Sequence, residues 1–152
     1  MADLRVRRYR PDDDARVREL YAEALRAAGT DPAETPPETD LDDVPGTYFD
    51  GGTFLVGEVD GRVVATGALE RVDETAAELR RMRVDPDRQR RGYGRAVLDE
   101  LEARARDLGY DRLVLETAAH QGAVPFYEAA GYDETGRRRW KQFELVAMEK
   151  RL

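Results

Sequence analysis

The sequence is most informative at residues 78–95, which run ELRRMRVDPDRQRRGYGR. The first part, Glu78–Val84, predicts a β-strand. After the glycines, apolar residues recur on one face from Arg95 to Leu108, which predicts an amphipathic helix that ends at Gly109. The segment therefore predicts a strand and a helix joined by a short loop rich in arginine and glycine.

This loop between strand and helix has the features of an anion site. No Ser, Thr, Asp or Asn directly precedes the helix, so its first amides have no side-chain cap. Such amides carry partial positive charge, and Gly92 and Gly94 let the backbone approach a phosphate closely. Residues 80–95 also hold seven arginines and two aspartates, a local charge of +5 in a chain of net charge −7. A pyrophosphate fits these features, although a solvated arginine face would show the same charge run.

The glycine spacing separates this loop from two common phosphate loops. A P-loop requires GxxxxGK[ST], but neither Lys nor Ser/Thr follows these glycines; a dinucleotide fingerprint requires GxGxxG, but only Gly92-Tyr93-Gly94 is present. Instead, Gln89-Arg-Arg-Gly-Tyr-Gly94 resembles the Q/R-x-x-G-x-G/A motif of the GNAT superfamily of N-acetyltransferases. Downstream, Ala123-Val-Pro-Phe-Tyr127 and Ala130-Gly-Tyr132 resemble the family's A-x-x-x-Y helix and the Gly-aromatic pair that ends it.

The resemblance implies acetyl-CoA as acyl donor and a set of residues that bind it. The backbone of Met82 and Val84 would pair with the pantetheine arm in a gap between splayed strands, and the amides from Gln89 to Arg95 would take the pyrophosphate. His120 stands where the family often has an asparagine that contacts the pantetheine arm. The cofactor-binding residues implied are Met82, Arg83, Val84, Gln89, Arg90, Arg91, Gly92, Tyr93, Gly94, Arg95, His120 and Tyr127.

The same resemblance assigns the catalytic roles. Tyr127 occupies the position of the tyrosine that reaches the coenzyme A sulfur, and its phenol has one O–H to donate. Glu78 lies six residues before Val84, the spacing of a general-base glutamate in histone-type members; Glu70 on the preceding strand, or an ordered water, is the alternative. The oxyanion would rest on a backbone N–H, that of Met82 or its neighbour.

Elsewhere, the chain alternates strands and helices without the regular order of a Rossmann domain. We expect one α/β (α+β) domain over residues 1–152: a mixed, mostly antiparallel sheet of six to seven strands with about four helices. An acceptor-side variable region would cover about 1–75 and an acetyl-CoA-binding core about 78–132. The further elements expected are a strand at Val6, a helix over Val17–Ala28, an irregular acidic segment over 30–50 with a short helix at Leu41–Val44, a hairpin over 53–70 turning at Asp60-Gly61, a strand at Leu113–Leu115, a helix over Ala123–Ala130 and two strands around Trp140-Lys141.

Composition narrows the chemistry. The chain has no cysteine and a single histidine, His120, so thiol catalysis and multi-histidine metal sites drop out, and no metal is expected. Overall acidity disfavours nucleic acid as a partner, and the absence of a long apolar run and of a signal-type N-terminus favours a cytoplasmic protein without a membrane partner. Only Lys141 and Lys150 are lysines among 25 basic residues. Adaptation to high salt or a GC-rich coding bias would each give that pattern, and a homodimer is left open.

The acceptor is left open by the sequence. The acids at 31–50 would suit a cationic amine, whereas Arg137, Arg138, Arg139 and Lys141 would suit a carboxylate-bearing acceptor. The resemblance therefore predicts transfer of an acetyl group from acetyl-CoA to a primary amine of a small molecule, amino acid or peptide, by direct attack in a ternary complex. A non-catalytic, acyl-CoA-binding regulatory module is the alternative.

Overall fold

The computed structural model describes residues 3–152, which form a seven-stranded sheet of order β1-β2-β3-β4-β5-β7-β6. All neighbouring strands are antiparallel except β4 and β5, which are parallel. The strands are β1 (Arg5–Arg8), β2 (Thr53–Val59), β3 (Arg62–Arg71), β4 (Ala76–Val84), β5 (Arg112–Ala118), β6 (Asp133–Trp140) and β7 (Phe143–Arg151). The helices are α1 (Asp14–Ala27), α2 (Thr39–Asp42), α3 (Val44–Tyr48), α4 (Tyr93–Asp107) and α5 (Val124–Ala129), with short 3₁₀ turns η1 (Pro11–Asp13), η2 (Pro32–Glu34), η3 (Pro86–Arg88) and η4 (Ala119–Gln121).

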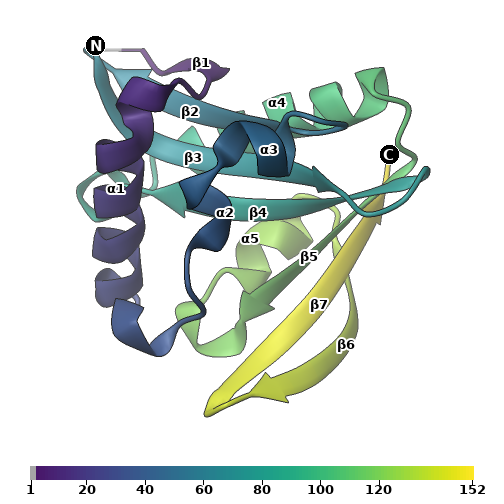
Figure 1. Ribbon diagram of the computed structural model, residues 1–152. Helices are drawn as coiled ribbons and strands as arrows, with labels where there is room; N and C mark the ends of the chain where they lie inside the picture. The colour runs from purple at the N-terminus through teal and green to yellow at the C-terminus, as the bar shows by residue number, and fades with distance from the viewer. Residues whose placement is uncertain (1–2) are drawn as a thin grey trace.

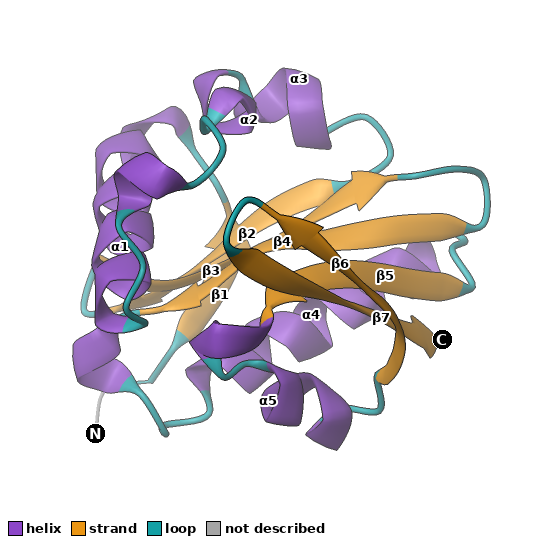
Figure 2. Ribbon diagram, turned by 90° about the horizontal axis from the view of Figure 1, so that it is seen from below, coloured by secondary structure: helices purple, strands orange, loops and turns teal. Residues whose placement is uncertain are grey.

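Helices cover both faces of the sheet. Figure 1 shows α1, α2 and α3 on the near face, and Figure 2 shows α4 and α5 on the opposite face. Each face has its own apolar core. Phe54 and Val56 of β2 pack toward α1–α3, while Leu55 between them packs toward α4. Because β2 is buried on both faces, its sequence does not alternate between apolar and polar residues but is continuously apolar at residues 54–56.

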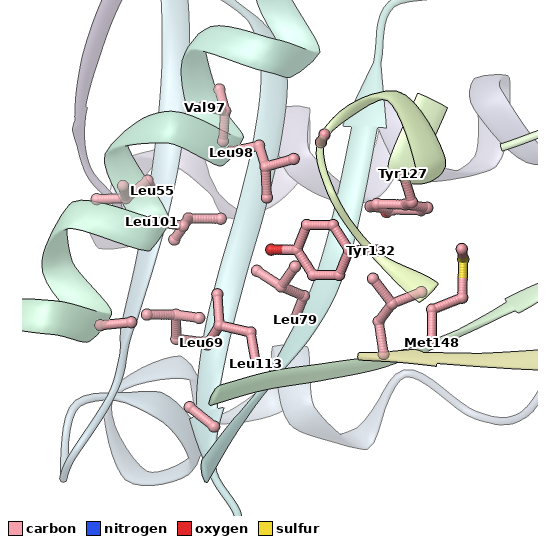
Figure 3. Close-up of a cluster of buried hydrophobic side chains, with 14 of the residues drawn as sticks. Leu55, Leu69, Leu79, Val97, Leu98, Leu101, Leu113, Tyr127, Tyr132 and Met148 are labelled. Atoms are coloured by element: carbon pink, nitrogen blue, oxygen red, sulfur yellow. The ribbon is translucent and has the colours of Figure 1, made fainter. Parts of the chain in front are cut away.

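The core beneath α4 also holds the C-terminal half of the chain together. In Figure 3, Leu98 and Leu101 of α4 lie among residues from the sheet, beside Tyr127 and Tyr132. Leu98 and Leu101 are fully buried, and Tyr132 is 1% exposed. Tyr127 and Tyr132 meet edge to face with ring centroids 5.8 Å apart. The start of α4 and the tyrosine of α5 are therefore fixed relative to one sheet.

The predicted fold class is confirmed, with five α-helices in the described part where about four were expected. The hairpin turn is confirmed in detail, because Asp60 and Gly61 have φ angles of 53° and 80°, as a type I′ turn requires. The acidic segment 30–50 is more ordered than expected, since it contains η2 and the two helices α2 and α3. No helix in residues 3–152 has the length and apolar character needed to cross a bilayer.

Strand β4 contains a β-bulge that was not predicted from the sequence. Thr66 pairs with Arg83 and Ala68 with Arg80, so Arg81 and Met82 together face Gly67. Arg81 has a φ of 57°, in the left-handed region that a residue with a Cβ seldom adopts. A Cβ on Gly67 would lie 2.6 Å from Met82 Sδ and 2.7 Å from Leu101 Cδ1, so glycine leaves room for these side chains opposite the bulge.

Strand β4 then separates from β5. The two strands pair only where Ala76–Glu78 lies beside Arg112–Val114, whereas β5 continues to pair with β7 up to Ala118. In Figure 1, β5 and β7 run obliquely away from β4. Beyond Glu78, β4 therefore has one edge without a neighbouring strand, and the predicted gap between splayed strands is present.

Candidate functional site

The open edge of β4 borders a cleft of about 480 Å³. One wall is the end of β4 with the loop into α4, and the other comes from α5 and the C-terminal half of α1. Its lining residues are Ala24, Leu25, Ala28, Met82, Arg83, Val84, Arg88, Gln89, Arg90, Gly92, Tyr93, Gly94, Arg95, Gln121, Gly122, Ala123, Phe126 and Tyr127. The strand, the glycine loop and the tyrosine singled out in the sequence thus line one cavity.

The N-terminus of α4 opens into this cleft without a side-chain cap. Gly92 is the N-cap, with a φ of 79°, and no side chain bonds to the first amides. The first turn of a helix has no intrahelical partner for its N–H groups, so these donors are available to an anion. A Cβ on Gly94 would lie 3.3 Å from Val84 Cγ2 and 3.6 Å from the ring of Phe126. Glycine therefore keeps the backbone tight against the cleft floor.

The two carbonyls predicted to face the gap both point away from β3. The carbonyl of Met82 accepts a hydrogen bond from its neighbour Arg83 Nη1 at 2.7 Å, and that of Val84 accepts from Gln89 Nε2 at 3.0 Å. By contrast, the carbonyl of Arg81 accepts from Thr66 Oγ1 of β3 at 2.6 Å. The bulge thus turns the carbonyl groups of Met82 and Val84 toward the gap. There they accept hydrogen bonds from the side chains of Arg83 and Gln89.

The arginines of residues 80–95 are less free than their number implies. Arg80 bonds to Glu70 at 2.7 Å, Arg81 forms a bidentate pair with Asp40, and Arg95 bonds to Asp99 at 2.8 Å. The cleft cations without an ion pair in residues 3–152 are Arg83, Arg88 and Arg90. Only part of the local charge of +5 is therefore left unpaired at the cleft. Arg91 was expected at the cofactor, but it lies outside the cleft lining.

A second cavity, of about 410 Å³, lies on the other side of Tyr127. It is bordered by β4 and β5 where they separate, by the segment after α1, and by the β6–β7 hairpin. Its lining includes Tyr21, Thr30, Pro36, Glu78, Arg80, Glu116, His120, Arg138, Trp140 and Phe143. Five residues line both cavities: Leu25, Met82, Arg83, Gln121 and Tyr127.

Tyr127 stands where the two cavities meet. Its side chain is 6% exposed, and its hydroxyl makes no hydrogen bond to another residue in the described part of the chain. Burial raises the pKa of Tyr127 to about 12, against a smaller opposing effect of Arg83. The phenol thus stays protonated at neutral pH, with its proton available to an atom placed at the junction.

Glu78 lies in the second cavity, opposite Glu70 across the β3–β4 ladder. The Glu70 carboxylate accepts a hydrogen bond from Arg80 at 2.7 Å. The Glu78 carboxylate makes no hydrogen bond within residues 3–152 and lies 4.0 Å from the same arginine. Partial burial raises the pKa of Glu78; Arg80 opposes this shift, while Glu70 and Glu116 add to it. A carboxylate with a raised pKa and a vacant lone pair is suited to accept a proton.

Comparison with known proteins identifies this arrangement. The model of the acetyltransferase (GNAT) family matches residues 15–132. The chain belongs to the GNAT family. Membership confirms the resemblance seen in the sequence.

Named relatives and solved structures agree. N-acetyltransferase 8 from Homo sapiens is 33% identical over 107 residues, which are 65% of this chain and 47% of the relative. N-acetyltransferase 8 from Rattus norvegicus is 36% identical over 106 residues, 64% of this chain and 48% of that protein. The chain thus spans about half the length of these curated relatives. A GNAT acetyltransferase of Staphylococcus aureus Mu50 shares the fold with a TM-score of 0.89 at 19% identity over 99% of both chains. The structure of yncA from Salmonella typhimurium, with its cofactor acetyl-CoA, aligns with a TM-score of 0.76 at 22% identity over 98% of this chain and 94% of that one.

Within this GNAT fold, His120 is placed differently from the expectation. It lines the second cavity and not the cleft beside α4. Its Nε2 is 2.6 Å from Thr30 Oγ1, and its ring stacks on Phe143 with centroids 5.3 Å apart. The neighbouring Gln121 lines both cavities. Gln121, and not His120, therefore borders the cleft beside α4.

Several lining residues escaped the sequence analysis. Phe126 lies inside a recognised motif and Arg88 directly precedes the other, so their position in the sequence was a usable signal. Ala24 and Ala28 of α1 carry no signal, because small residues on a helix usually mark ordinary packing. Among residues 3–152, no group of three or more His, Cys, Asp or Glu side chains is arranged to hold a metal ion.

Proposed function

We propose that this chain transfers an acetyl group from acetyl-CoA to a primary amine in a ternary complex. The observation that carries the proposal is the meeting of two cavities, of about 480 and 410 Å³, at Tyr127, whose residue is 6% exposed. One cavity has anion donors and the other has a carboxylate with a raised pKa. Two substrates that must exchange a group need such a shared point.

The residues present fit acetyl-CoA in the first cavity. The uncapped amides of α4 and the close approach at Gly94 suit the pyrophosphate, and Arg83, Arg88 and Arg90 add charge. The carbonyls of Met82 and Val84 face the gap, where an extended amide-bearing arm would replace the side-chain donors they now have. Acetyl-CoA would supply the acetyl group as a thioester.

Glu78 and Tyr127 would then move the protons. Glu78 accepts a proton from the acceptor, directly or through a water, so that the amine nitrogen has a free lone pair for the carbonyl carbon. Tyr127 donates its hydroxyl proton to the sulfur as the carbon–sulfur bond breaks. When the amide forms, the nitrogen loses a second proton, which restores the hydroxyl of Tyr127, and the proton held by Glu78 passes to solvent. The nitrogen thus loses two protons in all and the sulfur gains one.

A thiol-release assay with acetyl-CoA and a panel of primary amines tests the proposal, with thermal unfolding measured beside it. We expect acetyl-CoA to raise the melting temperature and thiol release to require an amine. Binding without turnover by any amine would favour the regulatory module, and absence of binding in both low and molar KCl would refute the proposal. Both salt levels are needed because at about 1 M ionic strength the screening length is only about 3 Å.

A further inference from the structure

The second cavity has an aromatic wall. His120, Phe143 and Trp140 stack in a row, with centroid separations of 5.3 and 6.1 Å and interplanar angles of 19° and 8°. All three line the cavity, and Pro36 and Tyr21 are also in its lining. Parallel rings at a cavity wall favour a further flat group, because aromatic rings attract one another beyond their apolar contact area.

The acids of residues 31–50, which the sequence suggested could recruit a cationic amine, do not line this cavity, and five of them already have partners. Asp40 is held by Arg81, and Asp42 and Glu38 by Arg18. Asp31 and Asp43 accept backbone N–H groups at the starts of η2 and α3. The acids at 31–50 are therefore not an open surface that collects cations.

The basic groups are used as well. Arg138 forms a bidentate pair with Glu116 at 2.6 and 2.7 Å, and Arg137 bonds to Glu134 and Glu144. Arg80 bonds to Glu70. Arg83 has no ion pair among residues 3–152, but it also lines the acetyl-CoA cleft, where phosphates compete for it. The cavity thus offers one open carboxylate, Glu78, and no cation reserved for an acceptor carboxylate.

Hydrogen bonds also join the two segments that border the cavity. Gln142 at the tip of the β6–β7 hairpin donates to Glu34 of η2 at 3.0 Å. Thr30, which is 3% exposed, lies 2.6 Å from His120 and 3.4 Å from Gln121. These bonds narrow the room for an extended chain that would have to pass between η2 and the hairpin.

We propose that the acceptor is a small primary amine with an aromatic end and no carboxylate, and not an amino acid or a polypeptide. The inference rests on the proposed function and names the substrate class of the same site. The amine lies near Glu78, and its ring packs on Phe143 and Trp140. An α-carboxylate would enter a half-buried site where Arg80, Arg81 and Arg138 are already paired and where acetyl-CoA phosphates compete for Arg83, which is costly.

A matched panel of acceptors tests this class. Phenethylamine has the amine and the ring; phenylalanine adds a carboxylate, phenylalaninamide neutralises it, butylamine removes the ring, and a short peptide with N-terminal phenylalanine adds a chain. We expect kcat/KM for phenethylamine to exceed that for butylamine by about tenfold to a hundredfold, the value of burying one aromatic side chain. Phenylalanine and the peptide should fall at least about tenfold below phenethylamine, and phenylalaninamide should recover part of the loss to phenylalanine.

Two variants distinguish the effect of losing a ring from the aromatic wall from the effect of a general loss of stability. Phe143→Leu keeps apolar volume but removes the ring, so kcat/KM for phenethylamine should fall about tenfold more than that for butylamine. Phe49→Leu is the matched control, because Phe49 packs against the core that contains Tyr48 and Phe54 and lines neither cavity. It should leave the ratio of the two amines unchanged.

The outcomes distinguish this inference from the proposed function. Phenylalanine, butylamine or the peptide matching phenethylamine would overturn the inference while the acetyltransferase proposal stands. An unchanged amine ratio in Phe143→Leu would also overturn it. Acetyl-CoA that binds while no member of the panel is acetylated overturns the inference too. Failure of acetyl-CoA to bind would overturn the proposed function itself.

Discussion

Removing the carboxylate of Asp40 should destabilise the protein far more than removing an ordinary surface acid. Asp40 of α2 accepts two hydrogen bonds from Arg81, at 2.9 and 2.5 Å, and one from Tyr48 at 2.5 Å. The side chains of Asp40 and Arg81 are only 6% and 11% exposed. Although burial alone would raise it, the bonds from Arg81 and Tyr48 hold the pKa of Asp40 below its usual value.

The size of the effect follows from what Asp40→Ala leaves behind. The guanidinium of Arg81 and the fully buried hydroxyl of Tyr48 would both lose their partner. Breaking one side of a buried ion pair costs about 3–5 kcal/mol. For a domain of this size, each kcal/mol lowers the melting temperature by about 2–4 °C, so we expect a loss of about 10 °C.

Urea unfolding followed by circular dichroism measures this cost, and Arg81→Gly supplies the second arm of a double-mutant cycle. Glycine at position 81 adopts the φ of 57° without strain, so the bulge survives while the charge is removed. The double variant should cost less than the sum of the singles by about 1–3 kcal/mol. A cost below about 1 kcal/mol for Asp40→Ala, the value of an exposed pair, would refute the reasoning.

The pH dependence of stability provides a second test of the role of Asp40. The folded pKa of Asp40 is below its unfolded value, so the carboxylate contributes full stability above the unfolded value of 3.8. That contribution is lost as the pH falls through the folded pKa. The gap between wild type and Asp40→Ala should therefore narrow only in strong acid, and a gap that narrows near neutral pH would contradict the assignment.

Four further substitutions probe the site. Tyr127→Phe should lower kcat by about a hundredfold or more while the acetyl-CoA Kd is kept, because only the donated proton is removed; equal losses in both would make Tyr127 structural. Glu78→Gln should raise the melting temperature at pH 7 to 8, and the gain should vanish as the pH falls to the unfolded value of 4.5, because burial raises the folded pKa; a gain that persists in acid would contradict this cause. Gly94→Asp should abolish acetyl-CoA binding in calorimetry, because a side chain and a negative charge would face the pyrophosphate; normal affinity would place the site elsewhere. Gly67→Ala should cost about 1–3 kcal/mol in urea unfolding, because its Cβ meets Met82, Leu101 and Val97 within 2.9 Å; a neutral change would mean that the bulge can shift.

The features that the sequence predicts well are those that depend on neighbours in the chain. The turn at Asp60-Gly61 and the uncapped start of α4 are set by residue types within one turn of backbone. The run of residues 89–94 and the helix that ends at Tyr127 could be matched to a family because their spacing is local. Such features need no knowledge of the fold to be recognised.

Ion pairs and hydrogen bonds between residues far apart in the chain could not be predicted from the sequence. Arg81 is a charged residue in an arginine-rich strand, yet it is buried and bound to Asp40, 41 positions earlier. Glu102 sits on a helix that is otherwise amphipathic, but it is 4% exposed and bonds to Tyr132 and Lys150. Each partner is defined only once the strands and helices are assembled, so the burial of these charges could not be read from periodicity.

The ion pairs of the arginines in residues 80–95 change the expectation of how coenzyme A would be bound. The charge run at residues 80–95 suggested electrostatic attraction, but Arg80, Arg81 and Arg95 are occupied by Glu70, Asp40 and Asp99. What stays available in the described part of the chain is Arg83, Arg88 and Arg90, together with the groups that act through the backbone: the amides at the start of α4 and the edge of β4 beyond Glu78. Because backbone donors are rigid and weakly screened at contact distance, binding through them should depend much less on salt than binding through arginines would. The affinity for acetyl-CoA should therefore fall by less than about tenfold between low and molar KCl, as calorimetry would measure, and a loss of several hundredfold would show that the arginines carry the binding after all.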